Sequence, residues 1–250
     1  MNISPTQITK WRQCQRLYAY EYVEGQRPPP SARQQFGTDM HKQLERWLRT
    51  GTPPDQSPAG RTAAQGIRPE VLPAPSGALL VEHNIVIPGV HGGVDIAGFA
   101  DLVEPPTLLR RWPLVVDHKS TSSLQWAKTP ADLATDPQAL IYALWAMLAF
   151  TVPTCEIRWV YYVASNPRSG SRKPAGCRPV GGIFRAADPA YQAQIQELAD
   201  DCWRMSEVRR LGVRAAQLPP SPQSCSAFEG CVHTERCALS PHDKITSFFG

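Results

Sequence analysis

The sequence predicts an α/β protein in which a mixed central β-sheet is flanked by helices. Helix-like and strand-like segments follow one another in the order α-α-β-β-β-α-β-β-α along the 250 residues. Hydrophobic residues make up 42% of the chain, which supports a buried core and excludes general disorder. Residues 114–116 (LVV) are continuously apolar, as expected of a strand covered on both faces.

Four helices are predicted by apolar residues at helical spacing and by their terminal residues. Ser4 is a suitable N-cap with Pro5 behind it, and Gly25 can close this first helix. Asp188 is a plausible N-cap for the last helix, with proline again at the first helical position. We expect helices at 5–24, 36–49, 130–150 and 189–211.

Five segments read as strands, and a proline-rich excursion separates them from the second helix. The excursion covers residues 52–77 and predicts a surface loop with at most a short helix inside it. The strands are expected at 78–87, 93–103, 113–120, 155–164 and 181–186. We therefore predict one domain over 1–250, with its catalytic core at 36–211.

Charge and hydropathy restrict the classes of partner. The 26 basic and 22 acidic residues give a net charge of +4, which tolerates a nucleic-acid partner without establishing one. No apolar run approaches the roughly 20 residues that a membrane span needs. The first residues lack the basic and apolar regions of a secretory signal, so we expect a protein without membrane contact.

The most informative residues lie on the second and third predicted strands. Asp117 and Lys119 are two residues apart, so their side chains project from the same strand face. If the two strands are neighbours, Asp101 and Asp117 can converge on one cation together with the carbonyl of His118. Such ligands suit Mg²⁺ or Mn²⁺, and Lys119 can orient an attacking water beside a phosphate. The alternative is a surface ion pair on an edge strand.

An ordered set of motifs resembles a known family. His41 lies on the second helix, Asp101 and the Asp117/Lys119 pair follow, and Gln138 and Tyr142 form a Q-x-x-x-Y motif. In this order they resemble the RecB-type branch of the PD-(D/E)XK nuclease superfamily. That branch includes the nuclease domains of RecB and AddB, CRISPR-associated adaptation nucleases and many phage exonucleases. The resemblance implies a restriction-endonuclease-like core and a metal-dependent DNA exonuclease.

The resemblance also implies roles for single residues. His41 would be a further metal ligand beside Asp101, Asp117 and the His118 carbonyl. Gln138 and Tyr142 share one helix face and would touch DNA or position Lys119. Asp95 rivals Asp101, because the two lie six residues apart on one strand face. Glu82, between apolar residues of the first strand, is a candidate to support the ligands or the substrate. Two departures from the family pattern are Ala100 in place of proline and a long connection after Asp101.

Seven cysteines without a secretory signal argue against a disulfide framework. Cys225, Cys231 and Cys237 are evenly spaced near the C-terminus, and Cys14 on the first helix is the natural fourth. Their spacing is wider than in most zinc knuckles, and four thiolates suit a [4Fe–4S] cluster. The RecB-like family agrees with this arrangement. We expect residues 1–30 and 219–250 to form an iron–sulfur clasp; zinc, with His233 as a substitute ligand, is the alternative.

A basic segment at 165–178 is a candidate for contact with DNA. Arg168, Arg172 and Lys173 lie there among Gly, Ser and Pro, which predicts a loop able to contact phosphates. An ordinary solvated hairpin tip is the competing interpretation. The expected substrate is DNA that is single-stranded or has a free end.

Two further expectations concern the setting of the protein. A non-catalytic DNA-binding subunit of a recombination, repair or CRISPR adaptation complex is the alternative function, although intact Asp101, Asp117 and Lys119 count against it. The family analogy implies a partner protein in one of those processes. It also implies the cytoplasm of a bacterium or of a phage-infected cell.

Overall fold

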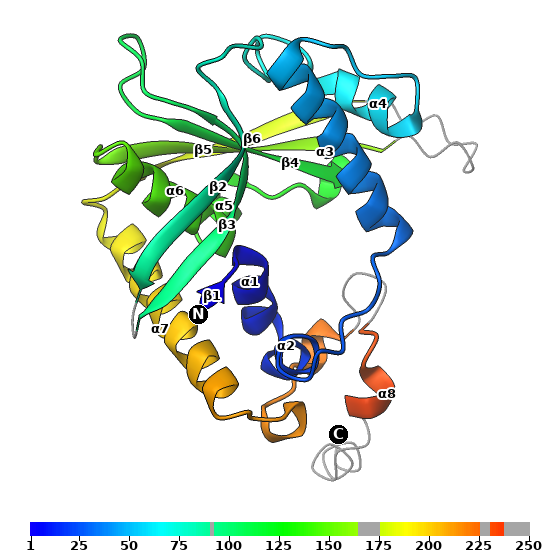
Figure 1. The fold of residues 1–250 in the computed structure, drawn as a ribbon, viewed down its shortest axis with the longest axis vertical. Coiled ribbons are helices and arrows are strands. Elements are labelled where there is room, and N and C mark those ends of the chain that lie inside the picture. The colour runs from blue at the N-terminus through cyan, green and yellow to red at the C-terminus, as the bar shows by residue number, and fades with distance from the viewer. Residues whose placement is uncertain (91–92, 165–175, 226–230, 238–250) are drawn as a thin grey trace. The chain divides into compact units, whose positions relative to one another are not determined.

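The structure is a computed structural model that describes residues 1–90, 93–164, 176–225 and 231–237. The chain forms two compact units, each assembled from segments that are distant in the sequence (Figure 1). The terminal unit comprises Met1–Pro29, Ile87–Ala97 and Gln196–Gly250. The central unit comprises Pro30–Val86 and Gly98–Ile195.

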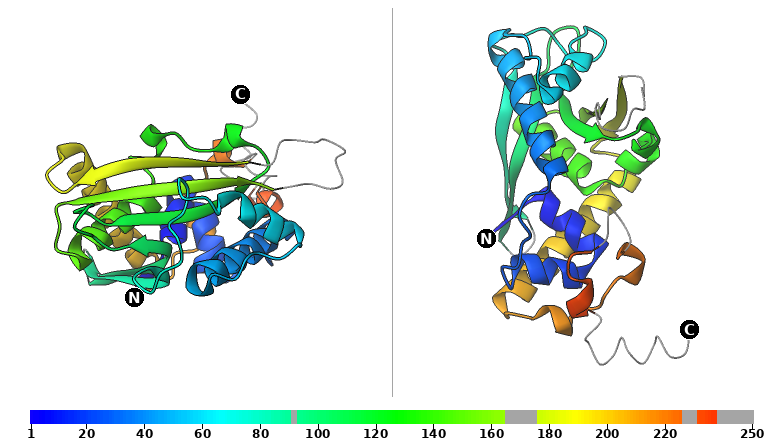
Figure 2. Two further views of the ribbon diagram at one scale, coloured as in Figure 1. Left: turned by 90° about the horizontal axis from the view of Figure 1, so that it is seen from above. Right: turned by 90° about the vertical axis from the view of Figure 1, so that its right-hand side faces the viewer.

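A mixed β-sheet organises the central unit. Strand β3 (Val94–Glu104) is antiparallel to β4 (Leu114–Thr121), which runs parallel to β5 (Thr154–Val163). Strand β6 (Cys177–Arg185) is antiparallel to β5, and β2 (Leu80–Val90) pairs with β3. The parallel β4–β5 pair requires a crossover, which the helices between these strands supply. The predicted mixed sheet is confirmed (Figures 1 and 2).

Helices cover both faces of this sheet. Helix α3 (Ala32–Thr50) buries Met40, Leu44 and Leu48 in a cluster that includes Val160 and Tyr162 of β5. Helix α6 (Pro137–Ala149) lies on the opposite face, because Tyr142 meets Trp159, whose side chain alternates with Val160. Shorter helices are α4 (Pro58–Ala63), α5 (Pro130–Leu133) and the 3-10 turns Ala64–Gly66 and Leu124–Trp126. The sheet flanked by helices is therefore as predicted.

The terminal unit is mainly helical. It contains the two-residue strand β1 (Asn2–Ile3), helices α1 (Pro5–Gln13) and α2 (Gln15–Tyr22), and the later part of α7 (Pro189–Arg210). Strand β1 pairs in parallel with the start of β3. The tail adds the 3-10 turns Ala215–Gln217 and Pro222–Ser224 and the helix α8 (Thr234–Cys237). Ile8, Trp11 and Tyr18 are buried in this unit.

Three predicted elements differ from the observed ones. The expected first helix breaks at Cys14, whose backbone is extended (φ −165°, ψ 114°). The expected helix at 130–150 is two helices, because Asp136 caps a new start at Pro137 and accepts the N–H groups of Gln138 and Ala139. Strand β6 is longer than expected, since it pairs with β5 from Cys177 to Arg185.

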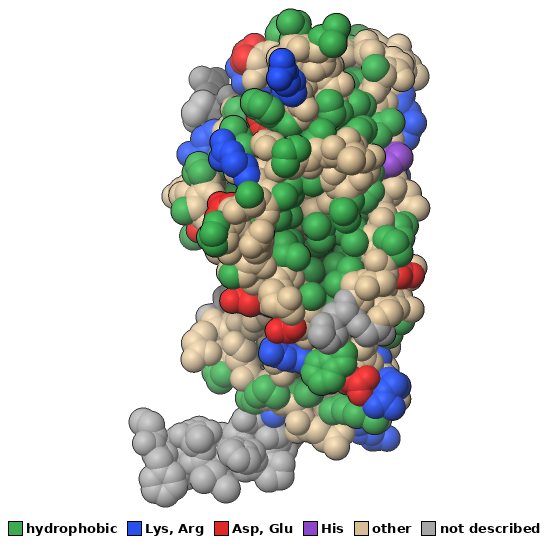
Figure 3. Space-filling view, turned by 90° about the vertical axis from the view of Figure 1, so that its left-hand side faces the viewer, with side chains coloured by type: hydrophobic (Ala, Val, Ile, Leu, Met, Phe, Trp, Pro, Cys, Tyr) green, Lys and Arg blue, Asp and Glu red, His purple; other side chains and the backbone are tan. Residues whose placement is uncertain are grey.

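One side of the molecule is largely apolar. In Figure 3 hydrophobic side chains cover the middle of the face shown, and Lys and Arg side chains lie toward its margins. No helix among the described residues is both long and apolar enough to cross a membrane.

Candidate active site

The register of β3 and β4 places Asp101 next to the Asp117–Lys119 segment. Leu102 pairs with Val116 in the antiparallel ladder, so one residue further along Asp101 comes opposite Asp117. Asp101 Oδ2 accepts the backbone N–H of His118 at 2.7 Å, and both aspartates are buried. Two buried carboxylates therefore lie at the end of the β3–β4 pairing.

His41 joins this position from α3. One ring nitrogen, Nε2, donates to the carbonyl of His118 at 2.8 Å, and the other, Nδ1, lies 3.5 Å from Asp101 Oδ1. Burial lowers the pKa of His41, but the hydrogen bond to Asp101 and the charges of Asp101 and Asp117 outweigh it and raise the pKa to about 9. Burial raises the pKa of Asp101, and the contacts with His41 and His118 bring it down to about 2. The protonated imidazole of His41 thus faces two oxygen atoms, of Asp101 and of the His118 carbonyl, that are also suitable ligands for a metal cation.

Asp117 is held by a network that includes Lys119 and two residues of α6. Lys119 Nζ forms an ion pair with Asp117 Oδ2 at 2.5 Å and donates to Gln138 Oε1 at 2.9 Å. Gln138 Nε2 donates to Asp117 Oδ1 at 2.8 Å and to the Tyr142 hydroxyl at 2.6 Å. Tyr142 in turn donates to the carbonyl of Phe99 on β3 at 2.5 Å. The network fixes both ends of the D-x-K motif against α6.

The charge states of this network follow from its burial. Burial raises the pKa of Asp117 to about 6, although the charge of Lys119 opposes this. Burial alone lowers the pKa of Lys119, but Asp117 and Asp101 outweigh it and raise the pKa. At neutral pH Asp117 is therefore ionised and Lys119 protonated, so an ammonium group lies beside the carboxylates.

Glu82 lies beside the same carboxylate–histidine group. His41, Glu82 and Asp101 each offer one ligand atom, and these three atoms lie within 4.8 Å of one another. Burial and the charge of Asp101 raise the pKa of Glu82 to about 7. Its backbone has φ +48°, which is unusual for a residue with a side chain, and Arg49 donates to the preceding carbonyl of Val81 at 2.6 Å.

The arrangement has the ligands of a hard divalent cation. Carboxylate oxygens, a backbone carbonyl and an imidazole converge there, with an ammonium group alongside. The His118 imidazole takes no part: it is buried near the Tyr162 hydroxyl at 3.3 Å, and burial lowers its pKa to about 4. Its ring lies edge-on to the His41 ring with 5.8 Å between centroids, and the backbone carbonyl of His118 is the atom that His41 Nε2 contacts.

Other predicted residues lie elsewhere. Asp95 belongs to the terminal unit and accepts the Gly89 N–H at 3.0 Å, which leaves Asp101 as the aspartate of this group. Glu45, one turn after His41 on α3, pairs with Arg49 at 2.9 Å. Arg168, Arg172 and Lys173 lie outside the described residues.

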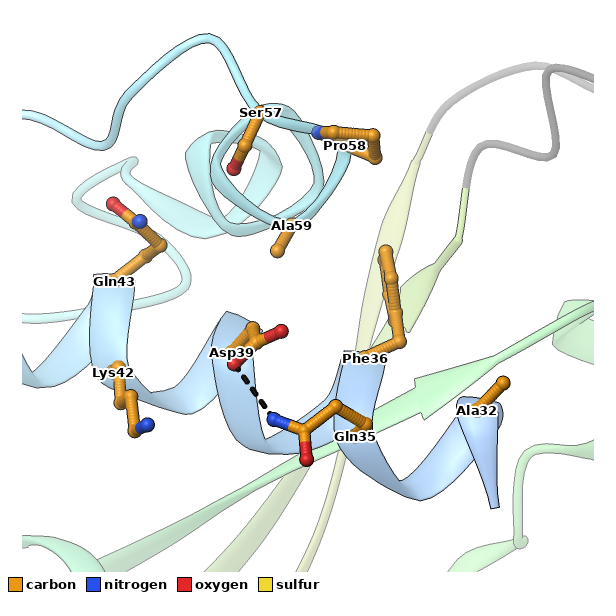
Figure 4. A pocket seen from close by; sticks show the side chains of 9 residues that line it. All are labelled: Ala32, Gln35, Phe36, Asp39, Lys42, Gln43, Ser57, Pro58 and Ala59. Atoms are coloured by element: carbon orange, nitrogen blue, oxygen red, sulfur yellow. Dashed lines mark hydrogen bonds between the residues drawn. The ribbon is translucent and has the colours of Figure 1, made fainter.

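A separate pocket of about 500 Å³ lies between α3 and α4 (Figure 4). Phe36 and Ala59 form part of its wall, and Gln35 donates to Asp39 at 3.0 Å along its edge. His41 does not line it, although Lys42 does. The pocket is therefore distinct from the group of ligands around Asp101.

The four regularly placed cysteines all belong to the terminal unit. The Cys231 N–H donates to the Cys225 carbonyl at 2.8 Å, and Arg16 Nη1 donates to Cys237 Sγ at 3.5 Å. Burial raises the pKa of Cys225, and so do the charges of the other three cysteines, Cys231, Cys237 and Cys14. The four thiols therefore lie close enough to influence one another.

The remaining cysteines and His233 have other surroundings. Cys155 and Cys202 are buried, and Cys177 donates to the Gln65 carbonyl at 3.2 Å. The His233 ring stacks on Tyr20 with 4.8 Å between ring centroids.

Comparison with known proteins gives the family. The sequence profile of the PD-(D/E)XK nuclease superfamily matches residues 2–78 and 63–238, which together span most of the chain. The chain belongs to the PD-(D/E)XK nuclease superfamily. A search of curated proteins found no match.

A solved structure has the same fold as this PD-(D/E)XK nuclease. It is titled "Crystal structure of SSO0001" and is 18% identical to the chain, with a TM-score of 0.51. The match covers 96% of this chain and 86% of that one. At this identity the likeness concerns the fold, and it agrees with the mixed sheet flanked by helices.

Membership of the PD-(D/E)XK superfamily confirms part of the sequence interpretation. It gives a metal-dependent nuclease, and the group around His41 and Asp101 supplies a matching acidic and histidine site. The RecB-type branch and the iron–sulfur cluster stay predictions.

Sequence reasoning missed Asp136, Arg49 and the Phe99 carbonyl. Only Asp136 had a readable signal, since an aspartate directly before a proline and an apolar run is typical of a helix start.

Proposed function

We propose that the protein is a divalent-metal-dependent DNA exonuclease that hydrolyses phosphodiesters at DNA ends. The observation that carries this proposal is the convergence of the Asp101 carboxylate and the His118 carbonyl on one position, with Lys119 beside Asp117. Asp101 and Asp117 are buried beside His41 and Lys119, and buried carboxylates need such a positive charge, which a metal ion can also supply. The superfamily match supports the reaction class.

Each residue of the site receives a role in this proposal. His41, Asp101, Asp117 and the His118 carbonyl would hold Mg²⁺ or Mn²⁺, and Glu82 lies close enough to His41 and Asp101 to add a carboxylate. An ion held there would supply Lewis-acid chemistry, which lowers the pKa of a water molecule and offsets charge on the phosphate. Lys119, kept protonated by Asp117, donates to a phosphate oxygen or to the attacking water. Gln138 and Tyr142 hold the side chains of Lys119 and Asp117 in position through hydrogen bonds.

We also propose that Cys14, Cys225, Cys231 and Cys237 bind a structural [4Fe–4S] cluster. All four belong to the terminal unit, and the charges of the other three raise the pKa of Cys225. Their spacing along the chain, wider than in most zinc knuckles, supports the cluster over a single zinc ion. Iron and zinc analysis of anaerobically purified protein distinguishes the two.

The nuclease proposal is tested with the variants Asp117→Ala and Lys119→Ala. Both should lose cleavage of DNA in Mg²⁺ and in Mn²⁺ while remaining folded. Asp39→Ala and Lys42→Ala are matched controls, because they remove the same charges from the pocket on α3. Cleavage by the Asp117 or Lys119 variant at the parent rate overturns the assignment.

The mode of cleavage and the biological setting need separate substrates. End-labelled linear DNA should be shortened from its ends, and circular DNA should survive. A parent protein that binds DNA but never cuts it would instead be the non-catalytic subunit that the sequence left open. From the family likeness we also propose a cytoplasmic role in recombination, repair or CRISPR adaptation.

A further inference from the structure

A stack of planar groups in the terminal unit runs from the core to the surface. Tyr18 is completely buried, and its ring stacks on Tyr22 with 5.3 Å between centroids and 23° between planes. The guanidinium carbon of Arg27 lies 3.9 Å from the centroid of the Tyr22 ring. Tyr22 is partly buried and Arg27 is exposed. The stack therefore ends at the surface on a planar cation.

The chain after α2 fixes the position of Arg27. Gly25 adopts φ +71°, which lets the chain reverse, and the Gln26 N–H donates to the Tyr20 carbonyl at 2.8 Å. Residues 28–30 are all proline, which restricts the backbone of Arg27 to extended conformations. The guanidinium is thus held over Tyr22 by a backbone with little freedom.

Three cations lie around the two rings, and one of them is paired with a carboxylate. Arg209 lies 5.6 Å from the Tyr18 ring and 5.9 Å from the Tyr22 ring. Lys10 lies 5.9 Å from the Tyr22 ring, but it pairs with Glu21. Among the described residues no carboxylate pairs with Arg27 or Arg209, and Arg209 Nε is buried without an acceptor. Arg209 Nη1 donates to the Asn2 carbonyl at 3.4 Å, so both arginines keep their positive charge without a carboxylate partner among these residues.

We propose that this Tyr22–Arg27 stack is a binding site for one base of a single-stranded nucleic acid. The outer face of an arginine guanidinium stacks on a base as an aromatic ring does, and it accepts any base. The remaining charge of Arg27 and Arg209 attracts the adjoining phosphates. The choice of a nucleic acid as ligand rests on the proposed function, since a nuclease must hold a strand. Binding at this site requires neither cleavage nor a metal ion.

A purely structural role makes a different prediction. Arg27 would then only cover the Tyr22 ring, and its removal would lower the free energy of unfolding by the contribution of one exposed cation–π contact. Binding of a strand would not change. The affinity for single-stranded DNA therefore separates the two roles, whereas a melting temperature alone does not.

The test measures binding of a fluorescent 20-nucleotide oligothymidine to the full chain in EDTA, by anisotropy. Arg27→Ala should weaken binding roughly 5- to 100-fold, the range expected for one stacked base. Arg27→Lys keeps the charge but loses the planar face, and it should stay within about twofold of Arg27→Ala. Arg210→Ala is the matched control: it removes an exposed arginine of α7 that pairs with Glu207, and it should bind like the parent.

The outcomes separate this inference from the nuclease assignment. If Arg27→Ala binds like the parent, or if Arg27→Lys restores parental affinity, the stacking site is wrong even when the parent cuts DNA. If the parent binds no oligonucleotide in EDTA, the site is also wrong. Loss of cleavage by Asp117→Ala with retention of strand binding leaves the inference standing.

Discussion

At the scale of single residues, protonated His41 contacts the oxygen atoms that are proposed as its fellow metal ligands. Its two nitrogens face Asp101 Oδ1 and the His118 carbonyl, the acceptors proposed as ligands. With a pKa of about 9, His41 is protonated at pH 7 when no ion is bound. A histidine binds a metal ion only through a deprotonated ring nitrogen, so the proton and the ion compete for His41.

This competition predicts the pH dependence of metal binding. Because His41 has to lose a proton, Mg²⁺ affinity should rise about tenfold per pH unit between pH 7.5 and 8.5. Titration calorimetry in buffers of different ionisation enthalpy should show about one proton released per ion. Affinity that stays constant over this range would mean that His41 does not bind the ion or is already neutral.

Gln138 offers a second prediction at this scale. It links Lys119 and Asp117 without facing the proposed ion, so Gln138→Ala should lower the cleavage rate roughly 10- to 100-fold, as loss of a supporting hydrogen bond does. Gln138→Glu, which restores an acceptor for Lys119 but loses the donor to Asp117, should recover only part of the rate. Gln43→Ala on the exposed side of α3 is the control, and an equal loss there would argue against a specific role.

At the scale of elements, β2 stores backbone strain at Glu82. A residue with a side chain at φ +48° costs about 1 kcal/mol relative to glycine. Arg49 bonds to the preceding carbonyl and ties this part of β2 to α3. The strain therefore lies next to the group of ligands, which fits a residue placed for chemistry.

The strain is measurable by comparing two variants. Glu82→Gly should be more stable than Glu82→Ala by about 1 kcal/mol in urea unfolding, because only glycine tolerates this φ. At Asn84, exposed on the same strand, the order should reverse and Ala should be the more stable. If Glu82→Gly is the less stable of its pair, the strained backbone is wrong.

Helices and strands were predictable where the spacing of apolar residues along a short segment identifies them. The apolar residues of β4 and the spacing along α3 identified both elements and placed Asp117, Lys119 and His41 correctly on them. The break at Cys14 was not predictable, because the apolar spacing continues through it. The full length of β6 depends on pairing with β5, a contact distant in sequence.

At the scale of the whole molecule, the chain combines a nuclease core with a cysteine-bearing terminal unit. Cys14, Cys225, Cys231 and Cys237 come from opposite ends of the sequence but belong to the same unit. A cluster bound there would join the two termini and stabilise the folded state, since binding favours the native chain. This is a structural role that the hydrolysis itself does not need.

Removing one cysteine ligand tests whether the proposed cluster stabilises the fold. Cys225→Ala should lower both the iron content and the melting temperature of the purified protein. Cys177→Ser, in the central unit, should keep the parental iron content. Equal iron in the two variants, or none in the parent, would contradict the cluster.

The candidate site was only partly predictable from the sequence. The order of motifs pointed to His41, Asp101, Asp117 and Lys119 before any geometry. The hydrogen bond from His41 to the His118 carbonyl, and the link from Tyr142 to the Phe99 carbonyl, join backbone atoms that no side-chain pattern reveals. The positive φ of Glu82 is likewise a property of the folded chain alone.

The most direct measurement is anomalous diffraction from crystals of the parent protein soaked in Mn²⁺. A peak should lie within about 2.0–2.5 Å of an Asp101 oxygen and of the His118 carbonyl, as carboxylate and carbonyl ligands require. Asp101→Ala crystals treated alike should lose it. A Mn²⁺ peak bound elsewhere, with this position vacant in protein that still cuts DNA, would contradict the account.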